Sequence, residues 1–314
     1  MGKIAFVFPG QGSQIVGMGK ELADSSEVVH DIFTRADKAL DEELSSLIFN
    51  GPQDTLTLTV NAQPSLLTTS IAILEKFKEA NVSPSFVAGH SLGEYTALVA
   101  AGALSFEDAV RTVRKRGEFM EEAVPAGQGT MAAILGMSSE NLQEVTDEIS
   151  STGHPVQLAN INCPGQIVIS GASEGVKKAC ELAKEKGAKR AIPLEVSGPF
   201  HSSLMEPAAE KLRAELDQIE IRDASVPVVA NVNAKEMTSS TQIKENLVKQ
   251  LYSPVLWENS VQYMLDQGVD TFIEIGPGKV LSGLIKKVNR RISTYAISDL
   301  ETLEAAIGAL KEGN

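Results

Sequence analysis

The sequence of 314 residues predicts an α/β fold with a mainly parallel sheet. The first observation is an uninterrupted apolar run at residues 3–8, which is typical of a strand buried on both faces. The second is that similar short runs at 86–88 and 271–275 each lead into a turn with glycine and then a helical pattern. Strands that alternate with helices favour parallel pairing, because the helix returns the chain across the sheet.

Helices are expected at about 64–80, from 92 to about 101, and at 106–124. The third has a predicted N-terminal cap, because Ser105 precedes Asp108 at the spacing of a capping residue and its partner. Apolar residues recur along it at helical spacing. Arg114 falls off this apolar stripe and is expected on a solvated face, whereas Arg116 falls on the stripe.

The middle of the chain has a different pattern, which predicts a strand, a helix, two strands, a helix and a strand. Their expected ranges are 131–135, 139–150, 156–161, 166–170, 174–186 and 190–194. This βαββαβ order is that of the ferredoxin-like unit. We therefore expect a ferredoxin-like small subdomain at 127–197, inserted in a large α/β subdomain formed by 1–126 and 198–314. A cleft between the two is the expected place for a site.

Composition excludes several classes of function. Apolar residues are 43% and charged residues 22%, as in ordinary globular proteins, and the net charge of −13 disfavours nucleic-acid binding. The longest nearly uncharged stretch, 95–106, is shorter than the roughly 20 residues that span a bilayer. The apolar run after Lys3 ends at Pro9-Gly10, unlike a signal peptide. Cys163 and Cys180 form no disulfide or zinc pattern, so we expect a cytoplasmic protein with reduced thiols and no metal.

The stretch GHSLGEY, residues 89–95, predicts a nucleophilic serine. A strand, then Gly-X-Ser-X-Gly, then a helix forms a nucleophile elbow, in which Ser91 occupies a tight turn at the helix N-terminus. Unpaired N–H groups and the helix dipole favour negative charge there. The N–H of Leu92 is therefore a candidate oxyanion donor.

A serine nucleophile needs a base, and the sequence has four histidines. His30 lies in a polar helical stretch, His154 in a turn, and His90 beside the serine with its side chain expected to point elsewhere. His201, in GPFHSSLM, remains as the candidate base, and its place after the serine fits the order found in hydrolases. No acidic residue stands out as an orienting partner, and a backbone carbonyl could take that role.

The glycine-rich loop PGQGSQ, residues 9–14, fails both nucleotide-loop patterns, because Ile15 and Met18 stand where glycine and lysine are required. The alternative is that the N–H of Gln11 is the second oxyanion donor, since that donor comes from another strand–helix loop.

Arg116 is the candidate for binding an anionic substrate. A buried arginine without an anion costs several kcal/mol. It could extend to solvent or pair with a structural carboxylate. Alternatively its guanidinium holds a substrate carboxylate bidentately, with Gly117 leaving room.

These segments together resemble the malonyl-CoA:acyl carrier protein transacylases of bacterial fatty-acid synthesis, over nearly the whole chain. The matching segments are FPGQGSQ, GHSLGEY, RG followed by Met120, NxNxPGQxVISG at 160–171, GPFHS, QLxxPVxW at 250–257 and IEIGPGKVLSGL at 273–284. The resemblance implies a hydrolase-like large subdomain with a ferredoxin-like small one, which agrees with the expected elements.

The resemblance also implies roles for individual residues. Ser91 would be acylated, His201 would be its base, and the Gln250 backbone carbonyl would orient His201. Gln11 and Leu92 would form the oxyanion hole, and Arg116 would bind the malonyl carboxylate. The residues implied beside the substrate are Met120, Asn162, and the pair His90 and Phe200, which accompany malonyl rather than methylmalonyl units in related modular enzymes.

The expected reaction is a ping-pong transfer of malonyl from coenzyme A to the phosphopantetheine thiol of acyl carrier protein, by a monomer without a cofactor. A serine thioesterase or esterase is the alternative that would accept water and would not need Arg116. A polyketide-pathway acyltransferase is a second alternative, and a non-enzymatic binding module is the most distant. Docking of an acidic carrier would need a basic cluster, either Lys184, Lys186, Lys189 and Arg190 or Lys286, Lys287, Arg290 and Arg291.

Overall fold

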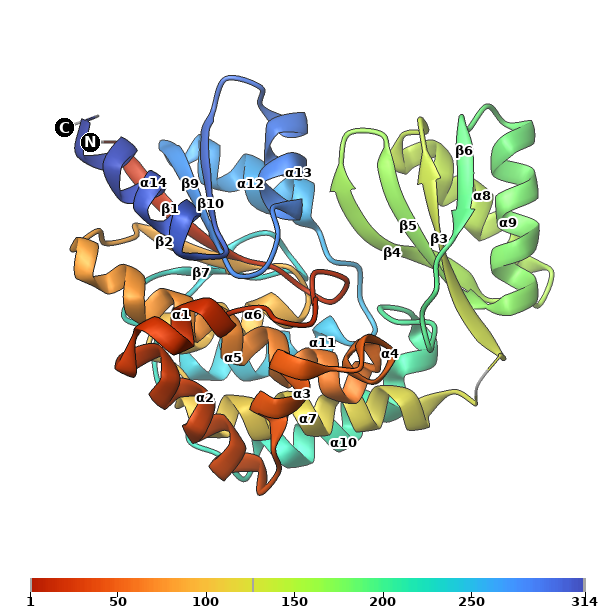
Figure 1. Cartoon of the computed structure of the whole chain (residues 1–314). Coiled ribbons are helices and arrows are strands. Elements are labelled where there is room, and N and C mark those ends of the chain that lie inside the picture. The colour runs from red at the N-terminus through yellow and green to blue at the C-terminus, as the bar shows by residue number, and fades with distance from the viewer. Residues whose placement is uncertain (1, 126, 313–314) are drawn as a thin grey trace.

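The computed structural model describes residues 2–125 and 127–312 and contains a six-stranded and a four-stranded sheet (Figure 1). The larger sheet has the strand order β10-β9-β1-β2-β7-β8. Its strands are β1 (Lys3–Phe8), β2 (Phe86–Gly89), β7 (Val228–Val229), β8 (Glu236–Met237), β9 (Val269–Ile275) and β10 (Ser293–Ile297). All its neighbours pair in parallel except β7 and β8, so the predicted α/β class with a mainly parallel sheet is confirmed.

Helices cover both faces of the larger sheet, and β1 shows why. Its Phe6 and Phe8 belong to the hydrophobic cluster of one face, while Ala5 and Val7 belong to the cluster of the other. The first face is covered by α2 (Glu27–Leu40), α5 (Thr59–Phe77), α6 (Leu92–Ala100) and α7 (Phe106–Ala123). The second is covered by α12 (Trp257–Asp266) and α13 (Val280–Val288). The remaining helices of this part are α1 (Lys20–Ser25), α3 (Leu44–Asn50), α4 (Gln53–Thr57), α10 (Glu206–Leu216), α11 (Ser240–Gln250) and α14 (Leu300–Glu312).

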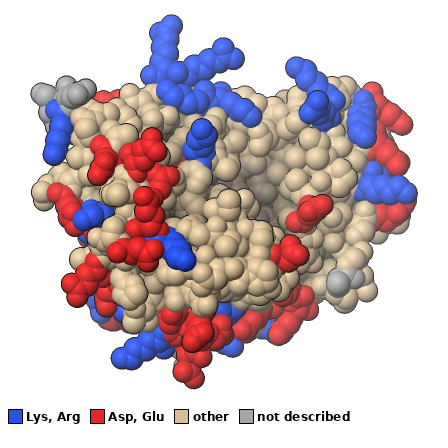
Figure 2. All heavy atoms as spheres, viewed as in Figure 1, with Lys and Arg blue, Asp and Glu red and all other residues tan. Residues whose placement is uncertain are grey.

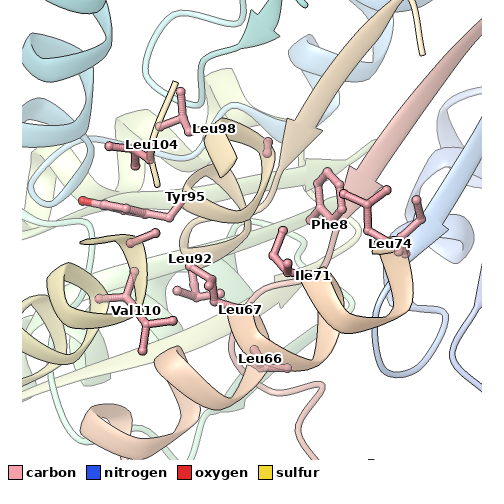
Figure 3. Close-up of a cluster of buried hydrophobic side chains, with 14 of the residues drawn as sticks. Phe8, Leu66, Leu67, Ile71, Leu74, Leu92, Tyr95, Leu98, Leu104 and Val110 are labelled. Atoms are coloured by element: carbon pink, nitrogen blue, oxygen red, sulfur yellow. The ribbon is translucent and has the colours of Figure 1, made fainter. Parts of the chain in front are cut away.

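The core on the first face fixes the two turns that later form the site. Figure 3 shows Leu67 and Ile71 of α5 between Phe8 of β1 and Leu92 of α6, and all four side chains are buried. Each such side chain contributes about 1.5–3 kcal/mol by leaving water. The ends of β1 and β2 are therefore held rigidly beside the start of α6.

The smaller sheet lies to one side and has the order β4-β5-β3-β6, with every pair antiparallel (Figure 1). Its strands are β3 (Gly129–Leu135), β4 (Val156–Cys163), β5 (Gln166–Ala172) and β6 (Arg190–Pro193), with α8 (Ser139–Ser151) and α9 (Ser173–Glu185) between them. The elements follow one another in the expected βαββαβ order. Ala126, at the predicted subdomain boundary, lies outside the described residues, and the division into subdomains stays a prediction.

A short bridge joins the smaller sheet to the segment that follows α11. Asn160 of β4 pairs in parallel with Val255. The Ile161 N–H donates to the Val255 carbonyl at 2.9 Å, and the Val255 N–H donates to the Ala159 carbonyl at 2.8 Å. The two parts of the molecule are thus tied by backbone hydrogen bonds as well as by the chain itself.

Two local expectations differ from the structure, and one is confirmed. The Ser105 cap of α7 is confirmed, because its Oγ accepts from the Asp108 N–H at 3.1 Å. Arg114 is not solvated but only 9% exposed, because Glu42 and Asn61 accept hydrogen bonds from its guanidinium at 2.7 and 2.5 Å. Helix α5 begins at Thr59 rather than near Pro64, which lies inside the helix. No helix in the ranges 2–125 and 127–312 combines the length and hydrophobicity that crossing a bilayer requires.

Candidate active site

Ser91 lies in the turn between β2 and α6, and its backbone adopts φ 50° and ψ −106°. This positive φ is uncommon for a residue with a side chain and is typical of strained functional turns. The flanking glycines permit two close approaches. A Cβ at Gly89 would lie 1.9 Å from the Gly93 carbonyl carbon, and a Cβ at Gly93 would lie 2.1 Å from the Phe8 carbonyl oxygen. The turns after β1 and β2 therefore pack backbone against backbone.

We expect Gly93→Ala to lower the free energy of unfolding by about 3 kcal/mol, because a backbone carbonyl cannot move away as a flexible side chain can. Urea unfolding measures this loss. Gly283→Ala in α13 is the matched control, because its added Cβ meets nothing within 4 Å. The control should be neutral or stabilising by about 0.5–1 kcal/mol. Equal effects at the two glycines would contradict the packing argument.

Ser91 and His201 form a hydrogen-bonded pair, with Ser91 Oγ 2.8 Å from His201 Nε2. The other ring nitrogen, Nδ1, donates to the backbone carbonyl of Gln250 at 2.7 Å, which leaves Nε2 unprotonated and able to accept a proton. His201 is only 3% exposed. Burial, followed by the field of Arg116, lowers the pKa of His201 to about 3, so the imidazole is neutral at physiological pH.

Gln250, at the end of α11, contacts three of the expected site residues. Its backbone carbonyl accepts from His201, its side-chain Nε2 donates to the Ser91 carbonyl at 3.0 Å, and its Oε1 accepts from Arg116 Nη2 at 2.9 Å. The resemblance implied only the backbone contact. The side chain therefore adds a second link between the serine and the arginine.

Arg116 is almost fully buried, at 1% exposure. Its Nη2 lies 3.1 Å from Ser91 Oγ, its Nη1 donates to Gln63 Oε1 at 2.7 Å, and its guanidinium lies over the Tyr95 ring at 5.5 Å. Within the described residues no carboxylate forms an ion pair with it. Of the three possibilities for Arg116, extension to solvent is wrong because the side chain is buried. A structural carboxylate, Glu94, lies near it but contacts it only through the Gln250 amide, so the guanidinium has no direct ion pair.

The role expected of Gly117 is also wrong. A Cβ on Gly117 would lie 2.8 Å from the Cα of Val60, at the start of α5. The glycine therefore allows α7 to approach α5 rather than making room around the neighbouring guanidinium.

Two residues that the sequence did not single out hold the serine turn. Asn231, after β7, accepts from the Ser91 N–H at 2.8 Å and donates to the Gly89 carbonyl at 2.8 Å. Glu94 Oε2 accepts from the Asn231 N–H at 2.8 Å and from Gln250 Nε2 at 3.1 Å. Glu94 could have been noticed, because it is the only acidic or basic residue, histidine aside, between Gly89 and Phe106. Asn231 carries no such signal.

A cleft of about 390 Å³ opens over the serine–histidine pair. Its lining includes six of the expected residues, which are Gln11, His90, Ser91, Met120, Phe200 and His201. Leu92 is the first residue of α6, so its N–H has no acceptor one turn earlier within the helix.

The walls of the cleft are held by side-chain contacts. Gln11 Nε2 donates to Thr59 Oγ1 at 3.1 Å, and that hydroxyl lies 2.9 Å from Ser197 Oγ. The His90 side chain points away from Ser91, and its Nε2–H donates to Asn162 Oδ1 of β4 at 2.8 Å. Burial lowers the pKa of His90, so it too is neutral. Asn162 thus positions His90 from the smaller sheet.

No group of three or more His, Cys, Asp or Glu side chains within residues 2–125 and 127–312 is arranged to hold a metal ion. Cys163 and Cys180 are free thiols, the first buried and the second half-buried. The chemistry that this arrangement can perform is acyl transfer through a serine, a neutral base and a buried cation.

Comparison with known proteins identifies the family. The model of the acyl transferase domain matches residues 5–308. The malonyl CoA-acyl carrier protein transacylase of Bacillus subtilis (strain 168) is 67% identical over 314 residues, covering 100% of this chain and 99% of the relative. The crystal structure of the corresponding transacylase of Clostridium perfringens superposes with a TM-score of 0.96 at 45% identity, covering 99% and 98% of the two chains.

A further structure contains a type II polyketide acyl-carrier protein in complex with its malonyl-transacylase. It matches with a TM-score of 0.95 at 44% identity, covering 98% of this chain and 99% of that one. From the family match and the full-length identity, the chain belongs to the acyl transferase family, among the malonyl CoA-acyl carrier protein transacylases.

Proposed function

We propose that this protein transfers a malonyl group from coenzyme A to the phosphopantetheine thiol of acyl carrier protein. The observation that carries the proposal is the buried guanidinium of Arg116, which forms no direct ion pair among the described residues and lies 3.1 Å from the oxygen of Ser91. A cation at this place selects an acyl group that ends in a carboxylate. The names of the full-length relatives support the same substrates.

In the first half-reaction, His201 Nε2 takes the Ser91 proton while Oγ attacks the thioester carbonyl. The N–H groups of Gln11 and Leu92 stabilise the oxyanion that forms. Collapse of this intermediate breaks the carbon–sulfur bond, and the imidazolium returns its proton to the leaving coenzyme A thiolate. The product is a malonyl ester on Ser91.

In the second half-reaction, His201 takes the proton of the carrier's thiol, and the thiolate attacks the malonyl ester. The same two N–H groups hold the second oxyanion, and the proton returns to Ser91 Oγ. Because His201 is neutral at physiological pH, it can act as the base at the start of both halves.

Arg116 would bind the malonyl carboxylate bidentately, with Met120, Phe200 and His90 as neighbouring walls. An uncharged acyl group would leave the guanidinium without a directly bonded anion and would forgo these charge-assisted hydrogen bonds. This contact gives the reason for malonyl rather than acetyl transfer.

We also infer two subdomains, with 127–197 as a ferredoxin-like insertion in a hydrolase-like unit formed by 1–126 and 198–314. Two observations support this division. The smaller sheet has its own buried cluster, which includes Ile134, Leu142 and Ile169. Its strand order, β6-β3-β5-β4, places the first and third strands of the unit in the centre, as the ferredoxin-like arrangement requires.

Intact-protein mass spectrometry after mixing with malonyl-CoA tests the function. We expect a malonyl adduct that persists without an acceptor and is discharged by phosphopantetheinylated acyl carrier protein. If no adduct formed while free malonate and coenzyme A accumulated, water would be the acceptor and the thioesterase alternative would hold. Transfer to a polyketide carrier protein in a parallel reaction would show whether the enzyme also serves such a pathway.

Basic side chains lie on both sides of the hollow in Figure 2, above α13 and beside the smaller sheet. Beside the smaller sheet one of the four basic residues, Lys186, pairs with Glu148. None of Lys286, Lys287, Arg290 and Arg291 forms an ion pair within the described residues. We therefore assign carrier docking to Lys286, Lys287, Arg290 and Arg291. Lys286 and Lys287 donate to the neutral Ile292 carbonyl and Gln166 side chain, so no carboxylate of the described residues neutralises this cluster before an acidic partner arrives.

Reversing two of these charges, Arg290→Glu with Arg291→Glu, is expected to raise the apparent KM for acyl carrier protein about tenfold. Formation of the malonyl adduct from malonyl-CoA should not change. Steady-state kinetics with varied carrier measures the first quantity. Lys20→Glu with Lys38→Glu, at exposed positions of α1 and α2, is the control for the same change in net charge. An equal rise in this KM in the control variant would contradict the assignment of docking to this cluster.

A further inference from the structure

Glu94 is a buried carboxyl group that the proposed reaction does not use. It is 0% exposed, Oε2 accepts two hydrogen bonds, and Oε1 has no partner within the described residues. A carboxylate in such surroundings is costly unless an opposite charge is near. We propose that Glu94 carries the counter-charge of Arg116 in the resting enzyme and takes up a proton from solvent when the substrate carboxylate binds. The inference rests on the proposed contact between malonyl and Arg116.

The amide of Gln250 links the two buried ions. Its Nε2 donates to Glu94 Oε2 at 3.1 Å, and its Oε1 accepts from Arg116 Nη2 at 2.9 Å. The amide dipole therefore points its positive end at the carboxylate and its negative end at the guanidinium. Both ionised forms are stabilised by this orientation. Glu94 and Arg116 are therefore not in direct contact, but one amide group bridges them and bonds to both.

The charged and titratable groups around Glu94 are few. Arg116 reaches it from α7 and favours its ionised form, and Tyr95 is the next residue on α6. His201 lies on the far side of Gln250 and is neutral. Asn231 contributes only a neutral backbone N–H to the carboxylate. The buried cluster of Glu94, Arg116 and their neutral neighbours thus has a net charge near zero while Glu94 is ionised.

A malonyl carboxylate on Arg116 would change this balance. Two carboxylates would then share one cation in a site of low dielectric constant, and the repulsion raises the pKa of Glu94 further. Burial already raises that pKa to about 7 in the free enzyme, so uptake of a proton near neutral pH requires little free energy. Protonation returns the net charge of the site to zero.

The direction of the pH effect follows from these values. Well below pH 7, as at pH 6, Glu94 is mostly protonated in the free enzyme and binds almost no further proton on loading. Well above pH 7, as at pH 8, Glu94 is mostly ionised in the free enzyme and becomes protonated in the malonyl-enzyme, so loading consumes protons. The equilibrium constant for malonyl loading should therefore fall as the pH rises above 7, by at most about tenfold per pH unit.

Proton uptake can be measured with an indicator dye in weak buffer while malonyl-CoA is added, with the adduct counted by intact-protein mass spectrometry. At about pH 8 we expect a substantial fraction of one proton per malonyl adduct, and at about pH 6 almost none. Glu94→Gln should lose the uptake at pH 8. The glutamine keeps an oxygen for the two donors and puts its NH₂ group where Oε1 has no donor. Glu118→Gln on α7 is the matched control and should keep the uptake.

Each outcome bears on a separate statement. Absence of a malonyl adduct would overturn the proposed function. An adduct that forms at pH 8 without proton uptake would overturn the inference alone. Proton uptake that persists in Glu94→Gln would also overturn the inference, and would make His201 the group that accepts the proton. If Glu94→Gln does not fold, the loading equilibrium of the unaltered enzyme from pH 6 to 9 decides, because a flat profile contradicts the inference.

Discussion

The Ser91→Ala enzyme is expected to form no malonyl adduct and to transfer malonyl at least about 10⁴-fold more slowly than the unaltered enzyme. The reason is that Ser91 Oγ is the atom that both His201 Nε2 and Arg116 Nη2 contact. Without it the base has no hydroxyl to activate. Intact mass after mixing with malonyl-CoA gives the first result, and a radiolabelled transfer assay gives the second.

Ser197→Ala is a suitable control for this substitution. Its hydroxyl lies on the same cleft but bonds to Thr59 rather than to His201. This variant should still form the adduct. A malonyl adduct on the Ser91→Ala protein would show that another side chain is the nucleophile.

Arg116→Ala is expected to lower malonyl transfer by about 10²–10³, because charge-assisted hydrogen bonds to the substrate carboxylate are lost. Acetyl transfer should hold or rise, since an acetyl group has no carboxylate that the guanidinium could bind. The measurement is the ratio of kcat/KM for malonyl-CoA to that for acetyl-CoA. The ratio matters more than either value, because it cancels any general loss of activity.

Arg114→Ala provides the matched control on the same helix. Arg114 is also buried, but its guanidinium bonds to Glu42 and Asn61. Its removal should lower stability and leave the malonyl-to-acetyl ratio unchanged. An equal loss of both activities in Arg116→Ala would contradict the carboxylate contact.

The strands and helices near the serine could be predicted from the sequence because their signals are local. The apolar run of β1, the glycines around Ser91 and the Ser105 cap each depend on neighbouring residues only. The predicted start of α5 was wrong because Pro64 was taken as the first helical residue, whereas the helix extends back to Thr59. The expected exposure of Arg114 was wrong because its partners, Glu42 and Asn61, are more than fifty positions away in the chain.

In the site, too, residues in a local pattern could be predicted, whereas contacts with distant parts of the chain could not. Ser91 and Arg116 could be proposed from the pattern around them, and His201 by elimination among four histidines. The Gln250 carbonyl came from the resemblance alone, because a backbone contact leaves no side-chain signal. Asn231 could not be found, since its two bonds to the Gly89–Ser91 turn depend on strand β7 lying beside β2.

The backbone bridge between Asn160 and Val255 has a consequence for turnover. The chain passes to and from the smaller sheet near residues 127 and 197, so the bridge is a third point of attachment. A part held at three points cannot swing freely as a lid. We expect the cleft to keep nearly the same width through the catalytic cycle. Coenzyme A and a protein carrier would then exchange by diffusion at a mouth that stays open, and turnover would not wait for a closing motion.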